Sequence, residues 1–310
     1  MSTQSNTMAD TASATQDTAS SAFPSTRIFA WSVRRELWEY RSTWIAPLAA
    51  AGFVMLGFVI SLVRISGVHM ITNLPPDKQM ALRLVPYGIA MAAVTITSVI
   101  VGISYCLGTL YNERRDRSIL FWKSMPVSDL MTVLAKASVP MIVLPLIAFV
   151  VICATQLIML PLHAATLAAR GQDAGSLFVQ VPLLRSWLLL FYSLVTLALW
   201  YAPIYGWLFM LSSWVKRGPF LWAVLPVVAI SVVEQIAFNT SYFVDLVKYR
   251  LGGSFHEAFV DFPHHHSMGF QWPTPDPVRF FSSPGLWLGL VVAVFFFGVT
   301  VWMRRRREPV

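Results

Sequence analysis

Long apolar segments, separated by shorter polar ones, make up most of the chain. Six of these segments approach the length of roughly 17–25 residues that a helix needs to cross a bilayer. They occupy residues 44–63, 84–111, 137–160, 186–211, 220–237 and 286–303. The pattern predicts an all-α polytopic membrane protein with six transmembrane helices.

The composition of the chain also indicates that the apolar segments face lipid. Hydrophobic residues make up 56% of the 310 residues and charged residues only 12%, whereas soluble domains carry about 25% charged residues. The net charge of +8 raises the question of nucleic-acid binding. The Lys and Arg residues, however, lie in short clusters beside the apolar segments, which is typical of a membrane surface and argues against a nucleic-acid partner.

The distribution of Lys and Arg predicts the orientation. An even number of spans places both ends of the chain on one side, and fifteen of the 23 basic residues fall on that side. Basic loops stay in the cytoplasm, so both termini are expected there, in a bacterial inner membrane. Residues 1–24 are rich in Ser, Thr and Ala and predict a disordered cytoplasmic tail, and residues 304–310 form a basic one.

A separate amphipathic helix is expected at residues 25–43, before the first span. Phe29, Val33, Leu37 and Tyr40 repeat at helical spacing and form an apolar stripe. Charged residues lie on the other side, and two tryptophans suit the headgroup level: Arg35, Glu36 and Glu39, with Trp31 and Trp38. The pattern favours an interfacial helix on the cytoplasmic leaflet. The alternative is a cytoplasmic extension of the first span.

The polar loop at residues 112–128 has an unusual composition. It begins with mixed charge, turns apolar and aromatic, and ends at Pro126. Ser128 is then a plausible N-cap for the following helix. A short amphipathic helix with aromatic knobs flanked by charges suits a groove on a partner protein. An ordinary loop on the membrane surface is an equally good interpretation of the composition alone.

The run ERRDRSILFWKSMPVSD in this loop resembles the corresponding loop of ABC transporter permeases of the type 2 exporter class. The architecture of an amphipathic helix, six spans and a long outer segment is similar as well. The resemblance implies a coupling helix that docks on an ATP-binding subunit. Carried over residue by residue, it assigns polar contacts to Glu113, Arg114, Arg115 and Asp116, and a docking surface to Phe121, Trp122 and Lys123.

The chain has no G-x-x-x-x-G-K-[ST] loop that would cradle phosphates. The expectation is therefore a transport subunit without enzymatic activity or a cofactor of its own. The resemblance implies two copies of a separate ATPase that bind ATP and Mg. It also implies a second permease chain, identical or related, that completes a dimeric path.

The outer segment, residues 239–285, is rich in His, Pro and aromatic residues. In the resembling family this region closes the outer end of the path, which makes Trp272, Phe280 and Phe281 candidate gate residues. His264, His265 and His266 are weak candidates for binding a transition metal, since three adjacent residues rarely point at one ion. Surface histidines are the better interpretation.

Glu234 is the one acid that falls within an expected span, and Gln235 follows it. Such a group can mark a transport path or a subunit interface, but Glu234 also lies near the end of its helix, where it can reach water. The chain is thus expected to be the permease of an ATP-driven exporter. The alternatives are an ion-coupled secondary transporter and a non-transporting membrane scaffold, and the substrate cannot be inferred from these residues.

Overall fold

A computed structural model describes residues 25–64, 76–116, 128–169, 171, 173, 175–260 and 273–306. The described part is helical throughout, apart from short turns and one isolated bridge between Phe259 and Pro275. The helices are α2 (Ser25–Glu39), α3 (Ser42–Arg64), α5 (Pro76–Arg115), α7 (Asp129–Ser138), η1 (Val139–Val143), α8 (Leu144–Ala169), α9 (Gly175–Gln180), α10 (Leu183–Trp214), α11 (Pro219–Phe238), α12 (Tyr242–Ala258), α13 (Pro277–Ser282) and α14 (Pro284–Arg306).

Six helices in the described residues are long and apolar enough to cross a membrane, which confirms the number of spans that the sequence predicts. They cover Ser42–Leu62, Leu82–Arg115, Asp129–Ala169, Leu183–Trp214, Pro219–Phe238 and Pro284–Arg306. Most extend beyond the apolar segments, because helices continue through polar residues that hydropathy alone leaves out. The chain is an all-α, multi-pass membrane protein.

The third span is built from α7, η1 and α8 in direct succession. The hydroxyl of Ser128 accepts a hydrogen bond from the Met131 N–H at 3.2 Å, which confirms the predicted N-cap. Pro140 lies inside this span and has no N–H to donate. The chain widens there into a short π-helix, which accommodates the missing hydrogen bond within an otherwise continuous helix.

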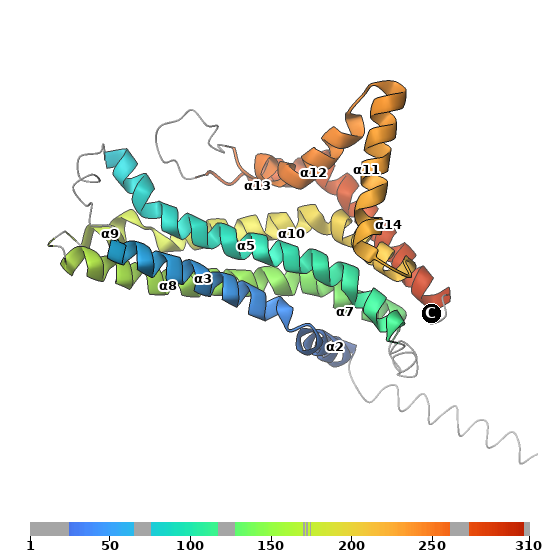
Figure 1. The fold of residues 1–310 in the computed structure, drawn as a ribbon, viewed down its shortest axis with the longest axis horizontal. Helices are drawn as coiled ribbons and strands as arrows, with labels where there is room; N and C mark the ends of the chain where they lie inside the picture. Colours follow the sequence, from blue (N-terminus) through green and yellow to red (C-terminus); the bar gives the residue numbers. More distant parts are fainter. Residues whose placement is uncertain are drawn as a thin grey trace, which may run out of the picture.

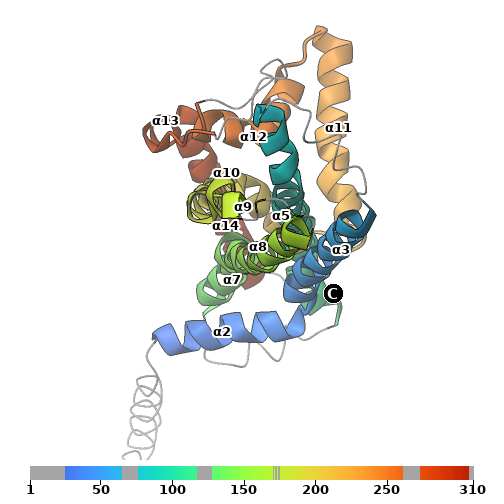
Figure 2. The same cartoon turned by 90° about the vertical axis from the view of Figure 1, so that its left-hand side faces the viewer.

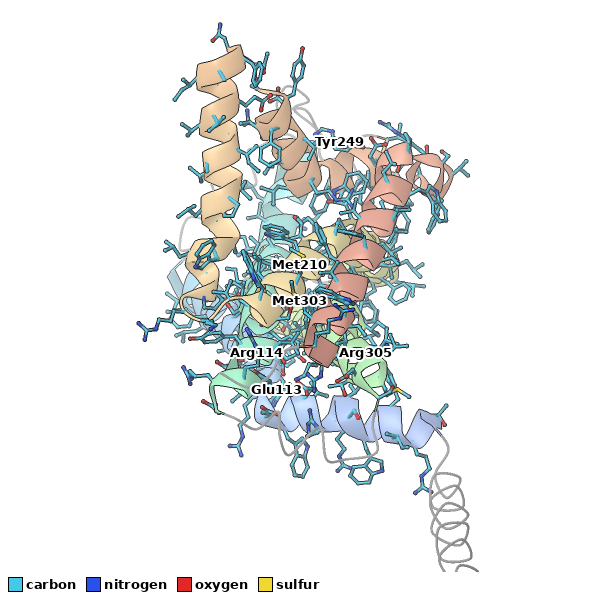
Figure 3. All side chains as sticks on the ribbon, turned by 90° about the vertical axis from the view of Figure 1, so that its right-hand side faces the viewer. Glu113, Arg114, Met210, Tyr249, Met303 and Arg305 are labelled. Atoms are coloured by element: carbon cyan, nitrogen blue, oxygen red, sulfur yellow. The ribbon has the colours of Figure 1, made fainter. Side chains whose placement is uncertain are left out.

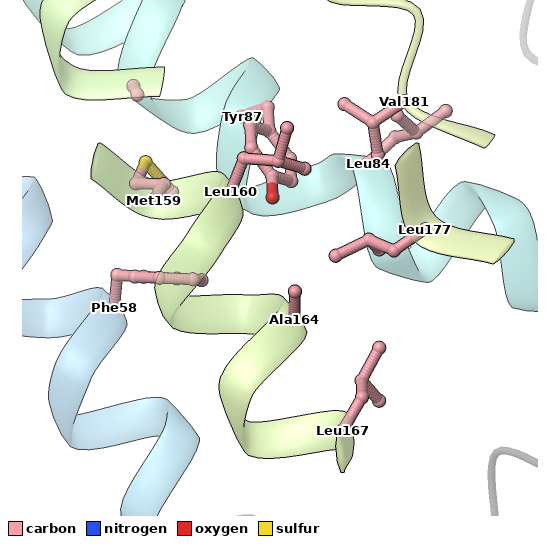
Figure 4. Close-up of a cluster of buried hydrophobic side chains, with 10 residues drawn as sticks. Phe58, Leu84, Tyr87, Met159, Leu160, Ala164, Leu167, Leu177 and Val181 are labelled. Atoms are coloured by element: carbon pink, nitrogen blue, oxygen red, sulfur yellow. The ribbon is translucent and has the colours of Figure 1, made fainter. Parts of the chain in front are cut away.

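Four long helices, α3, α5, α8 and α10, run side by side along the length of the molecule (Figure 1). Figure 4 shows the hydrophobic cluster that joins α3, α5 and α8 to the short α9 at one end, where Phe58, Tyr87 and Met159 meet Leu177. At the other end α2 crosses beside the bundle and packs on α7 (Figure 2). We refer to this as the α2 end.

The last helix, α14, packs closely on α10. Gly206 of α10 allows this approach, since a side chain there would press on the Ala293 backbone oxygen, 3.2 Å from where its Cβ would lie. In contrast, α11 stands apart from the bundle in both ribbon views (Figures 1 and 2) and has no buried residue. Its apolar side chains are therefore available to lipid or to another chain.

Candidate functional site

A cluster of charged side chains lies at the α2 end. It joins Glu36 of α2, Glu113 of α5, Lys136 of α7 and Arg304 of α14, and we call these four residues the charge cluster. Their exposed fractions lie between 0% and 6%. The Lys136 Nζ atom is 2.8 Å from Glu36 Oε1 and 3.0 Å from Glu113 Oε1, and it also donates to the Thr109 hydroxyl at 2.8 Å. Lys136 therefore holds three helices together.

Arg304 connects the cluster to both ends of the polar loop. Its Nη1 donates to Glu113 Oε2 at 2.9 Å, and its Nε donates to Asp129 Oδ1 at 3.0 Å. Glu113 lies in the last turn of α5, and Asp129 is the first residue of α7. One arginine of α14 thus holds together the end of α5 and the start of α7, the two helices that flank the polar loop. Figure 3 shows Glu113 close to α2, with Tyr249 far from it.

Hydrogen bonds complete the environment of Glu36. The Tyr105 hydroxyl donates to Glu36 Oε2 at 2.9 Å, and Arg35 Nη2 lies 2.7 Å from Oε1. Burial alone would raise the pKa of Glu36, but the charges and hydrogen bonds of Lys136 and Arg35 outweigh it and hold the pKa below its usual range.

Acids and bases alternate in this region. Three acids, Glu36, Glu113 and Asp129, face three bases, Arg35, Lys136 and Arg304, and a fourth acid, the partly exposed Glu39, lies 4.0 Å from Arg35. A buried ion pair adds little net stability compared with apolar packing, yet removing one partner typically costs about 3–5 kcal/mol. The cluster therefore acts mainly as a device of specificity, fixing one arrangement of four helices.

The four polar residues predicted to contact an ATPase divide into two pairs. Arg114 is buried, and its Nη2 donates to the carbonyl oxygens of Ser212 at 2.6 Å and Val215 at 2.8 Å, at the C-terminal end of α10. Glu113 is buried in the charge cluster. Arg115 and Asp116 are exposed and lie 3.2 Å apart. Glu113 and Arg114 thus make buried contacts between helices of this chain, whereas Arg115 and Asp116 lie on its surface.

Several predicted site residues lie outside the described residues. These are Phe121, Trp122 and Lys123 of the polar loop, and His264, His265, His266 and Trp272 of the outer segment. Their roles stay predictions. Within the part of the chain that the structure describes, no group of three or more His, Cys, Asp or Glu side chains could hold a metal ion.

The helices α12 and α13 form a hairpin that packs on the middle of α10. Phe280 of α13 is fully buried against Trp200 of α10, whereas its neighbour Phe281 is about half exposed. Antiparallel hydrogen bonds close the base of the hairpin, from Val260 N–H to Thr274 and from Asp276 N–H to Ala258. We call α12 and α13 the α12–α13 hairpin.

Arg250 is the central contact of this hairpin, and no sequence pattern predicts this role. Its guanidinium lies 4.6 Å from the centre of the Trp200 ring and donates to the Gly285 carbonyl at 3.0 Å. A Cβ on Gly289 would overlap the guanidinium, so only glycine leaves room for it. Burial lowers the pKa of Arg250, and no described acid forms an ion pair with it.

Glu234 and Gln235 lie at the turn between α11 and α12. The Glu234 carboxylate accepts hydrogen bonds from the Thr240 hydroxyl at 3.0 Å and from the Phe243 N–H at 2.9 Å. It thereby caps the start of α12, while Gln235 is exposed and donates to Asn239 at 3.3 Å. Asn239 has a positive φ of 51°, which the tight turn requires.

The fold and the charge cluster define the class of protein as an α-helical, multi-pass membrane protein whose span ends are tied together by buried ion pairs. Searches against protein-family models, curated protein sequences and solved structures found no match to this chain.

Proposed function

We propose that the chain is the membrane-spanning permease subunit of an ATP-driven exporter of the type 2 ABC class. Two permease chains form the substrate path, and two copies of a separate ATPase subunit bind ATP and Mg. The permease contributes no catalytic residue, because its task is to convert a movement of the ATPase into a change of access to the path.

The observation that carries this proposal is the connection of the polar loop to the rest of the bundle. Arg304 of α14 binds both Glu113 and Asp129, at the two ends of the loop. Lys136 extends the connection to Glu36 of α2. A force on the loop would therefore reach α2, α5, α7 and α14 together, as a coupling element requires.

The α2 end suits the cytoplasmic side. It carries the basic residues at the start of the chain and those at the end of α14, and basic segments stay in the cytoplasm. Arg115 and Asp116 are exposed at the start of the loop, where an ATPase would dock. Both termini and the loop would then face the same compartment as ATP.

Two further features fit a dimeric exporter. The lack of buried residues on α11 leaves an apolar surface that a second permease chain could cover. The α12–α13 hairpin, in turn, packs on the middle of α10 with Phe280 buried. A hairpin that packs on the middle of α10, away from the polar loop, is suited to close a path there.

Co-purification after mild extraction tests the proposal. We expect an ATP-binding protein to elute with the wild-type chain in about equal amount. A Glu113→Lys variant should lose ATPase stimulation by substrate yet still insert, with Lys248→Glu as the exposed control. Recovery of the chain without any ATP-binding protein, under conditions that preserve other membrane complexes, would contradict the proposal.

Sidedness provides a second check. A cysteine at Ser118, in a chain whose Cys106 and Cys153 are replaced by Ala, should react with an impermeant reagent only when the cytoplasmic face is accessible. Labelling from the outer face alone would remove both the orientation and the docking role of the loop.

One observation favours a second candidate, an ion-coupled transporter. Glu113 is an acid buried within a candidate span beside Lys136 and Arg304, and intramembrane acids often serve proton relays. The two candidates differ in energy source. Export that persists without a proton gradient but requires ATP favours the ABC permease, and the reverse favours ion coupling.

A further inference from the structure

The face of α2 that points away from the bundle is fixed by the charge cluster. Glu36 is buried against Lys136 and Tyr105, and this contact determines how the helix is rotated. Because a helix turns about 100° per residue, the positions opposite Glu36 recur every three or four residues along the other side of the helix. They are Arg27, Trp31, Arg34 and Trp38, which we call the basic–aromatic stripe.

The predicted apolar stripe therefore does not form the outward face. Phe29, Val33, Leu37 and Tyr40 are partly buried, and the Tyr40 ring packs edge-on against Tyr105 of α5 at 4.9 Å. Trp31 and Trp38 instead are 62% and 71% exposed. Such exposure of two tryptophans on one face marks a contact surface rather than a free one.

The stripe has an ordered internal arrangement. The Arg34 guanidinium lies 5.4 Å from the ring centre of Trp31 and 5.4 Å from that of Trp38. The two rings thus hold the cation between them, while no ion pair with a described acid engages Arg34. The nearby acid Glu39 lies on the other side of the helix and faces Arg35. The outward face is positive.

The stripe also lies next to a membrane crossing. The helix α2 ends at Glu39, and the first candidate span begins at Ser42 after a single turn. The Thr43 N–H bonds to the Tyr40 carbonyl at 3.1 Å, which keeps this connection short. Trp38 and the exposed Arg41 are therefore within a few residues of the bilayer surface, the level at which tryptophan is enriched in membrane proteins.

We propose that the basic–aromatic stripe binds the headgroups of anionic phospholipids. Arg34 bonds a lipid phosphate through its guanidinium, whose planar fork matches phosphate oxygens. Trp31 and Trp38 insert beside it at the headgroup level, and Arg27 and Arg41 add positive charge at either end. The charge of the face selects anionic over zwitterionic lipid. This inference requires only that α3 spans the membrane, and does not depend on an ATPase partner.

Native mass spectrometry of the purified chain, extracted from mixed phosphatidylglycerol and phosphatidylcholine bilayers, tests the proposal. We expect phosphatidylglycerol to remain bound to the wild type in preference to phosphatidylcholine. The variant R34Q/R41Q should lose phosphatidylglycerol affinity by on the order of tenfold or more, since each basic residue near an anionic surface contributes several-fold. The variant W31L/W38L keeps the charge and should lose an intermediate amount.

The matched control is K216Q/R217Q, which removes two exposed charges from the loop between α10 and α11 on the same side of the bundle. It should lose much less phosphatidylglycerol. Unchanged elution and thermal midpoints establish that the variants fold. Equal losses in the two double variants, or no preference for phosphatidylglycerol in the wild type, would overturn the proposal. Retained lipid with loss of a co-purifying ATP-binding protein would overturn it too, because the stripe would then be a protein-docking surface.

Discussion

The charge cluster and the α12–α13 hairpin secure the bundle in different ways. At the α2 end, three acids and three bases join four helices through short, directional contacts such as the 2.8 Å pair between Lys136 and Glu36. The hairpin is held by Trp200, Phe280 and backbone carbonyls, and its Arg250 contacts a ring face and a carbonyl in place of an acid.

This difference bears on which part of the molecule can move. Separating buried ions without new partners is costly, so the elements at the α2 end should move as one body. The contacts of the hairpin with α10 are mainly aromatic packing and hydrogen bonds to backbone carbonyls, so a shift of the hairpin separates no described buried ion pair. Under the proposed function, the charge cluster would transmit force and the α12–α13 hairpin would change conformation.

The largest expected effect is that of Lys136→Met. The substitution leaves Glu36 and Glu113 buried without their central cation, which should destabilise the chain by about 3–5 kcal/mol. Thermal denaturation in detergent measures it. Lys248→Met removes an exposed lysine that is 72% accessible and should change stability by about 0.5 kcal/mol or less. Similar midpoints for the two variants would show that the cluster does not hold the helices.

Arg304→Gln should have the next largest effect. It removes the charged hydrogen bonds to both ends of the polar loop, at a cost of about 2–3 kcal/mol. In the complex with an ATPase, we expect basal ATP hydrolysis to persist while stimulation by substrate is lost. Arg305→Gln alters the adjacent exposed arginine and should preserve coupling. Full stimulation by substrate in Arg304→Gln would show that coupling does not require the contact between α14 and the ends of the loop.

Gly289→Ala tests the hairpin. The new methyl group would displace the Arg250 guanidinium from Trp200 and from the Gly285 carbonyl, with a cost of about 1–2 kcal/mol. Hydrogen exchange should increase in α12 and stay unchanged in α2. Gly298→Ala in the same helix meets no atom within 4 Å and serves as the control. If Arg250→Ala does not reduce the effect of Gly289→Ala in a double-mutant cycle, the two residues are not coupled.

The smallest expected effect is that of moderate acidification. Because the pKa of Glu36 is lowered on folding, its contribution to stability is present above the unfolded value, about 4.5, and disappears as pH falls through the lower folded value. Stability should therefore be insensitive to Glu36 protonation from pH 8 to about 5 and decline only below about 4.5.

Glu39 serves as a control, because its pKa shifts in the direction opposite to that of Glu36. Burial, followed by the nearby charge of Glu36, raises its pKa, so Glu39 gains protons on folding as pH falls. Thermal midpoints across pH should show a weaker acid decline in Glu36→Gln, whereas Glu39→Gln should retain it. A wild-type decline that starts near pH 6 would mean that Glu36 is not held by the cluster.

The sequence was sufficient for the spans and insufficient for the cluster. Lipid requires long apolar helices, so hydropathy locates all six, and the cap at Ser128 follows from local chemistry. The partners Glu36, Glu113, Lys136 and Arg304, however, come from four separate helices. Only the fold brings them together. The one available signal was a lysine at the edge of an apolar segment, which the charge count treated as part of a loop.

The orientation of α2 shows the same limit. The periodic apolar residues predict a helix, and the structure partly buries their side. The sequence places Glu36 on the opposite side, whereas the structure buries Glu36 on the same side, against Lys136. Arg250 was missed for a related reason. Its partners are an aromatic ring and two glycines on other helices, and neither residue type signals an arginine site in sequence.

The central claim is that the α2 end moves as one body. Distances between spin labels, measured by double electron–electron resonance in the reconstituted complex, test it. Spin labels at Thr26 and Leu130, both exposed, report on α2 against α7 in a chain lacking Cys106 and Cys153. Labels at Leu130 and Lys248 report on α7 against the hairpin. On addition of ATP and Mg, the account predicts an unchanged distance for the first pair and a shifted distance for the second. A shift of the first pair as large as that of the second would contradict it.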